Sequence, residues 1–266
     1  SLRIEKRRWA KRNELPFIGY GAPVLAKAGD KGAVTTGLSP QAGEAGPALA
    51  DPVRLRALRS LPGTEVELNA MARVLDAGTG AIHLGKDATE AAVRTNGRLR
   101  DARIVAFATH GILPGEIEGF AEPGLIFTPP GRATPADDGI LTAAEAAGLD
   151  LSADWVILSA CNTGTTEGPG GGDALSALAR SFLYAGADAL LASRWRVGDK
   201  VTAALTVETL VNAKRNPKAG KAAAFQSAMR AIRTGKREDG SAVEGWSSDW
   251  AHPAAWAPFT LIATRN

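Results

Sequence analysis

The chain has 266 residues, of which 45% are hydrophobic and 22% charged, enough for a sizeable core in one large α/β domain or two small ones. No apolar stretch approaches the roughly 20 residues of a membrane helix, the basic N-terminus has no apolar signal region, and a single cysteine fits a reducing compartment, so we expect a cytoplasmic location. The net charge of +3 is too small to predict nucleic acid as the main partner, and the basic N-terminal cluster contains one aromatic residue, Trp9.

The first fifty residues contain two segments without a regular pattern. Residues 1–14 are basic, and because the chain begins with Ser1 we interpret them as the remnant of an upstream region. A short strand is predicted at 17–20. Residues 29–52 are rich in Gly, Ala, Pro and Ser, which is typical of a flexible insertion. We expect the folded domain to span 15–266.

Strand and helix patterns alternate through the rest of the chain. Strands are predicted at 81–84, 104–108, 124–128, 156–160, 189–192 and 259–263. Two helices begin with capping boxes, one from Thr64–Glu67 to Gly78 and one from Thr142–Glu145 to Gly148. The remaining helices are one capped by Asp87, one over 175–183 that Gly186 ends, one capped by Asp199 and one over 221–232. Strands that alternate with helices imply an α/β fold with a mostly parallel sheet covered on both faces.

Two of the apolar strands end in residues that suit acyl-transfer chemistry. His110 and Gly111 follow the strand at 104–108, and Cys161 follows the strand at 156–160. In an open α/β sheet, ligands bind at the carboxyl ends of the strands. If these two strands are neighbours, the imidazole and the thiol emerge at the same edge, within reach of each other.

The chemistry of this pair is that of an activated nucleophile. A thiol with the usual pKa of about 8.5 is only a few per cent thiolate at pH 7, and an adjacent imidazole can activate it and then protonate a leaving amine. The N–H groups of Gly111 and Cys161 are candidate donors to the oxyanion. Taken singly, Cys161 is a small buried hydrophobe and His110 a packed imidazole, whereas their shared position at strand ends favours catalysis. His83 is a weaker candidate base that we interpret as structural, and we expect His252 to be packed.

Several separated motifs resemble the CHAT domain, a caspase-like (clan CD) cysteine peptidase family. They are Phe17-Ile-Gly-Tyr-Gly-Ala-Pro23, Phe107-Ala-Thr-His-Gly111, Val156-Ile-Leu-Ser-Ala-Cys-Asn-Thr-Gly164, Gly168-Pro-Gly-Gly-Gly-Asp-Ala-Leu175, Ala192-Ser-Arg-Trp195 and His252-Pro-Ala-Ala-Trp-Ala-Pro-Phe259. The resemblance covers about residues 15–265. It implies a three-layer α/β/α caspase-hemoglobinase-like fold with a mostly parallel central sheet, a His110–Cys161 dyad, and hydrolysis of peptide bonds in protein substrates without a metal or organic cofactor.

The resemblance also implies partners. Domains of this family commonly follow tetratricopeptide or other repeat domains, and the start of this chain fits that arrangement. We therefore expect a protein or peptide substrate together with an upstream repeat domain or an activating protein partner, and no membrane or nucleic acid as a direct ligand.

The substrate pocket departs from the patterns of related peptidases. The position two residues before the nucleophile, which lines the first substrate pocket there, is Ser159 rather than the glutamine of caspases or the aspartate of metacaspases. The usual Val-Asp-Asp after the tryptophan reads Val197-Gly-Asp199, so that one acid is missing. We expect Ser159, Trp195 and Asp199 to contact the substrate.

The charges around this pocket leave its preference open. Arg194 and Arg196 would favour an acidic substrate side chain, whereas Asp138 or Asp199 would favour a basic one. Each of these charged residues has an alternative role as a helix cap or a surface residue.

Two other functions compete with proteolysis. A catalytically silent scaffold or protein-binding module would keep the fold and the dyad without turnover. Alternatively, the segment 164–172 ahead of a helix could bind phosphate, because helix N-termini attract anions. That segment lacks the lysine and hydroxyl of a GxxxxGK[ST] loop, and the chain has no Rossmann fingerprint, which argues against a nucleotide site.

Overall fold

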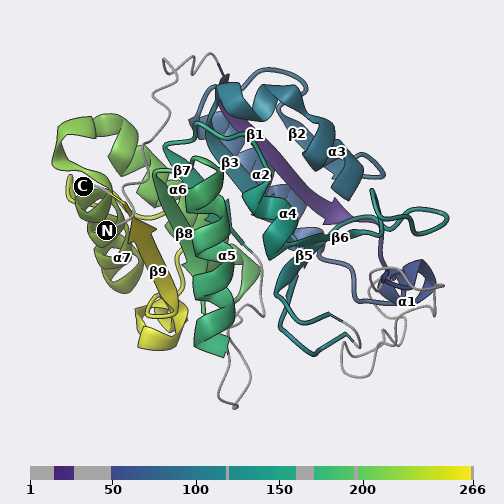
Figure 1. The fold of residues 1–266 in the computed structure, drawn as a ribbon. Helices are drawn as coiled ribbons and strands as arrows, with labels where there is room; N and C mark the ends of the chain where they lie inside the picture. The colour runs from purple at the N-terminus through teal and green to yellow at the C-terminus, as the bar shows by residue number, and fades with distance from the viewer. Residues whose placement is uncertain (1–14, 27–48, 118–119, 160–170, 195–196, 265–266) are drawn as a thin grey trace.

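The computed structural model describes residues 15–26, 49–117, 120–159, 171–194 and 197–264 (Figure 1). These residues contain nine strands. The strands are β1 (Leu15–Pro23), β2 (Ile82–Gly85), β3 (Ala102–Ala108), β4 (His110–Ile112), β5 (Gly124–Ile126), β6 (Ile140–Thr142), β7 (Trp155–Leu158), β8 (Ala189–Ser193) and β9 (Phe259–Ala263). Six of them form the main sheet, in the order β2-β1-β3-β7-β8-β9. All neighbours in this sheet are parallel except β8 and β9, so the predicted mostly parallel sheet is confirmed.

Helices cover both faces of the main sheet. They are α2 (Pro62–Val74), α3 (Glu90–Thr95), α4 (Ala143–Ala147), α5 (Gly171–Ala185), α6 (Asp199–Arg215) and α7 (Lys221–Thr234). A further helix, α1 (Pro52–Arg56), packs in a separate core with residues of β4, β5 and β6. One core combines the sheet with α3, α4 and α5, and the other combines it with α2, α6 and α7. Figure 1 shows α5 on the near side of the sheet. The result is the predicted three-layer α/β/α architecture.

The alternation of side chains along β3 explains why the sheet is sandwiched. Val105 and Phe107 belong to the core with α5, whereas Ile104, Ala106 and Ala108 belong to the core with α2. Successive side chains of a strand point to opposite faces. Because both faces are covered, consecutive residues of the strand are apolar, which is typical of a central parallel strand.

A second, smaller sheet begins where β3 leaves the main one. Strands β4, β5 and β6 are antiparallel, with His110 opposite Ile126 and Gly111 opposite Leu125. Only Thr109 separates β3 from β4, and its hydroxyl donates a hydrogen bond to the carbonyl of Ile126. His110 and Gly111, expected to form a polar strand end, therefore open a new strand.

Most predicted elements are confirmed, including the Thr142–Glu145 capping box of α4. The capping box at Thr64 and Glu67 is wrong. Helix α2 is capped by Leu61, three residues before Thr64, and Pro62 is its first residue, where the missing N–H costs nothing. Inside the helix, the Thr64 hydroxyl donates to the carbonyl of Leu61 at 2.7 Å. The helix also ends at Val74, before the predicted stop.

Two predicted N-caps are also wrong by one or two residues. Helix α3 is capped by Thr89 instead of Asp87, and the Thr89 hydroxyl accepts a hydrogen bond from the N–H of Ala92 at 3.0 Å. Helix α6 is capped by Gly198, and Asp199 is its first helical residue.

The predictions for residues 1–14 and for most of the 29–52 insertion fall outside the described part of the chain, although Pro52 itself begins α1.

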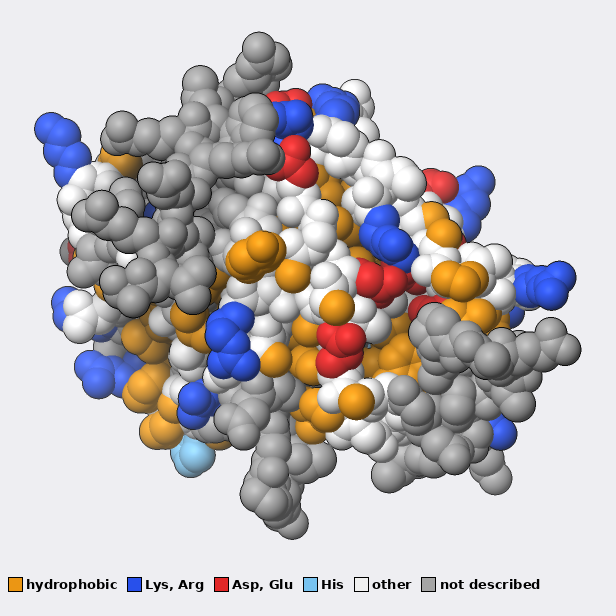
Figure 2. All heavy atoms as spheres, in the orientation of Figure 1, with side chains coloured by type: hydrophobic (Ala, Val, Ile, Leu, Met, Phe, Trp, Pro, Cys, Tyr) orange, Lys and Arg blue, Asp and Glu red, His pale blue; other side chains and the backbone are white. Residues whose placement is uncertain are grey.

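Two further features concern the helices and the charges at the surface. No helix in the described ranges is both long and apolar enough to cross a membrane. On the face shown in Figure 2, basic side chains lie scattered among acidic and uncharged ones.

Candidate active site

The carboxyl ends of β3 and β7 lie side by side. The two strands are parallel neighbours, with Phe107 opposite Leu158, and the N–H of Ser159 donates to the carbonyl of Phe107 at 2.9 Å. His110 lies two residues beyond β3, and Ser159 is the first residue beyond β7. The condition on which the predicted dyad depends, that the two strands are neighbours, is therefore met. Cys161 lies outside the described residues, so its distance from the imidazole stays a prediction.

His110 is held by a backbone group from a distant segment. The side chain is buried, and its Nε2 lies 2.7 Å from the carbonyl oxygen of Arg59. A carbonyl only accepts hydrogen bonds, so in neutral His110 the proton lies on Nε2 and Nδ1 is the nitrogen that can take up a proton.

The carbonyl that contacts His110 is itself held in place by a backbone ladder. The N–H of Ala26 donates to the carbonyl of Leu58 at 2.9 Å, and the N–H of Ser60 donates to the carbonyl of Ala26 at 2.8 Å. These bonds flank Arg59 on both sides, so the acceptor for Nε2 belongs to a fixed part of the backbone.

Ser159 contacts a buried acid, Glu67, for which the sequence predicts only a role in a helix cap. Its hydroxyl donates to Oε2 of Glu67, on α2, at 2.7 Å. Glu67 is 2% exposed, and burial raises the pKa of its carboxyl to about 7, with a smaller contribution from the negative charge of Asp199. The missed signal is positional: Glu67 falls on the same helix face as Leu68 and Met71, the buried apolar stripe of α2.

Asp199 lies beside the start of α2. A Cβ atom on Gly63 would be 2.2 Å from Oδ2 of Asp199, so the carboxylate occupies space that only a glycine leaves free. Asp199 is exposed, as is Arg194, whose N–H donates to the carbonyl of Pro258. Trp195 and Arg196 lie outside the described residues.

Asp138, one of the acids considered for substrate charge, is used within the fold. Its Oδ2 accepts the N–H of Ala50 at 3.0 Å, and its Oδ1 accepts the N–H of Ile140 at 2.9 Å. Both oxygens are satisfied by the backbone, so this carboxylate joins the α1 segment to β6.

The other two histidines have contacts of their own. His83, on β2, stacks on Tyr20 with ring centroids 4.6 Å apart, and burial lowers its pKa. His252 is exposed rather than packed as predicted, and its Nδ1 accepts the N–H of Ala254. The short helix that follows His252 explains the difference, because its first N–H groups need an acceptor.

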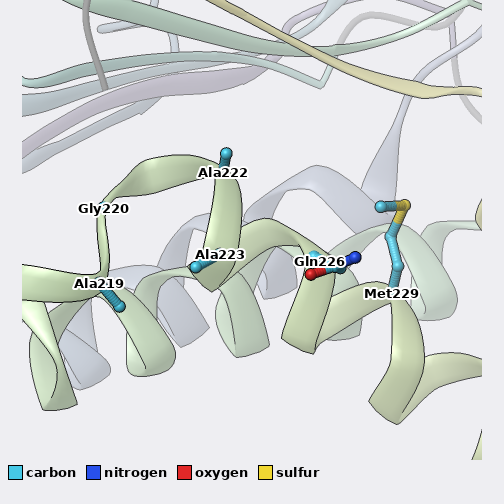
Figure 3. A pocket seen from close by; sticks show the side chains of 6 residues that line it. All are labelled: Ala219, Gly220, Ala222, Ala223, Gln226 and Met229. Carbon is cyan, nitrogen blue, oxygen red and sulfur yellow. The ribbon is translucent and has the colours of Figure 1, made fainter.

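A hollow lies along α7 (Figure 3). The residues that line it are Ala219, Gly220, Ala222, Ala223, Gln226 and Met229. None of these side chains is an acid, a base or a nucleophile, and none belongs to the ends of β3 or β7. This hollow therefore offers no chemistry to the candidate site.

The buried carboxyl of Glu67 predicts a pH dependence of stability. Its pKa is about 7 when folded against an ordinary value of 4.5, so between these pH values the folded state keeps a proton that the unfolded state has lost. The contribution of the Glu67 carboxyl to the free energy of unfolding is therefore lost as the pH rises from about 4.5 through about 7. We expect Glu67→Gln to raise the free energy of unfolding at pH 8, relative to wild type, by about 3 kcal/mol at most, and to change it little at pH 4.5.

Urea unfolding of wild type and Glu67→Gln at both pH values measures this difference. Glu65→Gln is the matched control, because Glu65 is exposed on the same helix. A stability difference between wild type and Glu67→Gln that is the same at pH 4.5 and pH 8 would contradict the raised pKa.

Comparison with known proteins places this geometry in a family. A family model, the CHAT domain, matches residues 22–264 and so includes the ends of both β3 and β7. No curated protein gives a significant match to the chain. Since the family model spans nearly the whole chain, this protein belongs to the CHAT domain family, which is related to caspase-like peptidases.

Proposed function

We propose that this chain is a cysteine endopeptidase domain that cleaves protein substrates with Cys161 as nucleophile and His110 as general base. The observation that carries the proposal is the parallel pairing of β3 with β7. It brings the chain segments that lead to the imidazole and to the thiol to one edge of the sheet, where α/β folds place their ligands. Membership of the CHAT domain family supports the same assignment.

The chemistry follows from the residues in this proposal. The Cys161 sulfur attacks the carbonyl carbon of the scissile peptide while its proton passes to Nδ1 of His110. The N–H groups of Gly111 and Cys161 donate to the oxyanion of the tetrahedral intermediate. The imidazolium then protonates the leaving amine, and water hydrolyses the thioester with His110 again acting as base. This scheme needs neither a metal nor an organic cofactor.

The contact between His110 and Arg59 supports the assignment of the base. A hydrogen bond from Nε2 to a fixed carbonyl orients the ring and stabilises the positive charge that develops during proton transfer. The acceptor is neutral, so it orients the base without the strong pull of a buried carboxylate.

We also propose that an upstream domain or partner protein regulates cleavage, and that Ser159, Trp195 and Asp199 line the substrate pocket. Ser159 donates a hydrogen bond to Glu67, and Asp199 is near enough for its negative charge to raise the pKa of Glu67, which supports a common pocket for Ser159 and Asp199.

A peptide-library digest with wild type and Cys161→Ala, read by mass spectrometry, tests the function. We expect cleavage by wild type and none above background by the variant. Cleavage that survives the substitution would contradict the peptidase assignment. Labelling of Cys161 by a thiol-reactive electrophile adds a second readout: if His110→Ala labels as fast as wild type, the domain is better described as a scaffold.

A further inference from the structure

Buried acids in the described part of the chain are compensated in two ways. Glu90 forms an ion pair with Arg94 at 2.7 Å, and Glu208 forms one with Arg237, also at 2.7 Å. Asp138 instead accepts two backbone N–H groups. A buried carboxylate is costly unless such partners are present, so each of these groups obeys the general rule.

Glu67 is the exception among these buried acids. It forms no ion pair with any described cation, and among the described residues its side chain has one hydrogen bond, which Oε2 accepts from Ser159. The other oxygen, Oε1, is buried without a hydrogen-bond partner in the described structure. Burial raises the pKa of this carboxyl to about 7, as it also does for Glu90 in spite of its ion pair, so the unpartnered Oε1 is what distinguishes Glu67.

The position of Glu67 links this uncompensated acid to the chemistry. Ser159, its hydrogen-bond donor, is two residues from Cys161 in the sequence. Asp199 is near enough for its negative charge to act on Glu67. Ser159 is half-buried and Asp199 is exposed, so the groups around Glu67 extend from the interior to the solvent. A cation that entered here would meet two carboxyl groups.

We propose that Glu67 is a specificity-determining residue that receives the guanidinium or ammonium group of an arginine or lysine side chain just before the scissile bond. The inference rests on the proposed peptidase function. The unpartnered Oε1 is the acceptor for the incoming donor, and Ser159 keeps Oε2 in place. Asp199 adds a second negative charge at the solvent side. Where Glu67 is protonated, binding of the cation releases that proton to solvent.

The alternative preference has weaker support in the structure. An acidic substrate side chain would need cations near Ser159, and the described candidate, Arg194, is exposed to solvent. Bringing a third acidic group toward Glu67 and Asp199 would add like-charge repulsion. The geometry therefore favours a basic side chain over an acidic one.

A pair of peptides that differ only before the scissile bond tests the inference. One carries arginine and the other citrulline, which has nearly the same shape without the charge. We expect kcat/KM of wild type to favour arginine by about 100-fold, because a buried charge pair is worth this much in binding. Glu67→Gln should reduce the ratio to about 10-fold or less, and Glu65→Gln, on the exposed face of α2, should leave it at the wild-type value.

A binding measurement separates this inference from the proposed function. Calorimetry with Cys161→Ala and the same two peptides, with and without Glu67→Gln, reports cation recognition without turnover.

Equal cleavage of both peptides by wild type, or a ratio of kcat/KM values that Glu67→Gln leaves unchanged, would overturn the inference while the peptidase function stands. Absence of cleavage combined with Glu67-dependent preference for the arginine peptide would overturn the peptidase function and support the cation site. Binding that does not distinguish the two peptides would overturn the inference in either case. Glutamine retains the hydrogen bond to Ser159, and thermal unfolding of each variant confirms that it is folded.

Discussion

Replacing His110 by alanine is expected to lower kcat/KM for peptide cleavage by about 1,000-fold or more, and replacing Cys161 as well is expected to add little. The two groups act as one unit in the proposed mechanism, because the imidazole creates the thiolate that attacks. Once either partner is gone, the other has nothing to act on. The losses of the two single variants should therefore be far from additive.

Single variants, the double variant and a control measured with one peptide substrate provide the test. His252→Ala is a suitable control, because His252 is exposed and its Nδ1 accepts a hydrogen bond from the backbone N–H of Ala254. It should retain wild-type kcat/KM. Losses for His110→Ala and Cys161→Ala that multiply in the double variant would show that the two residues act independently, which would contradict the dyad.

The central strands are the part of the fold that the sequence predicts well. The apolar runs that became β3, β7 and β8 are buried on both faces, and this double burial leaves a run of consecutive apolar residues bounded by polar ones. Their order in the sheet, in contrast, is not predicted by the sequence. The neighbour relation of β3 and β7 depends on packing between segments about fifty residues apart, and no local pattern encodes it.

The capping boxes illustrate where local patterns fail. The same spacing of threonine and glutamate is right at Thr142 and wrong at Thr64. At Thr142 both side chains hydrogen-bond the helix end, although Oε1 of Glu145 also pairs with Arg94. At Thr64 the helix has already begun, and Glu67 makes its hydrogen bond with Ser159, 92 residues later in the chain. Tertiary contacts, which a single sequence does not display, decide between these two outcomes.

The candidate site was predictable only in part for the same reason. The residues His110 and Gly111 stood out because polar residues follow an apolar strand. The carbonyl of Arg59 could not be identified, because every residue carries such a group and only the fold selects which one meets Nε2. Glu67 had a detectable signal, an acid on an apolar helix face, that the capping pattern concealed.

Phe107→Ala is expected to lower the free energy of unfolding by about 3–5 kcal/mol, the largest effect on stability that we predict. Phe107 is fully buried on β3, and its ring lies 5.3 Å from that of Phe182, 5.8 Å from that of Tyr20 and 6.1 Å from that of Phe127. These rings join the sheet, α5 and the segment after β5. Removing the central one leaves a cavity that its rigid neighbours cannot fill.

Urea unfolding of three variants distinguishes this packing effect from a general intolerance of substitution. Phe107→Leu keeps most of the volume and should cost about 1–1.5 kcal/mol. Tyr184→Ala removes an aromatic ring from α5 that is 74% exposed, so its stability should stay within about 0.5 kcal/mol of wild type. A cost below about 1 kcal/mol for Phe107→Ala, with unchanged dependence on urea, would contradict the aromatic core. Because His110 follows Phe107 by three residues, the same cavity should also loosen the strand end that carries the base, so Phe107→Ala should lose activity below its unfolding temperature while Tyr184→Ala should not.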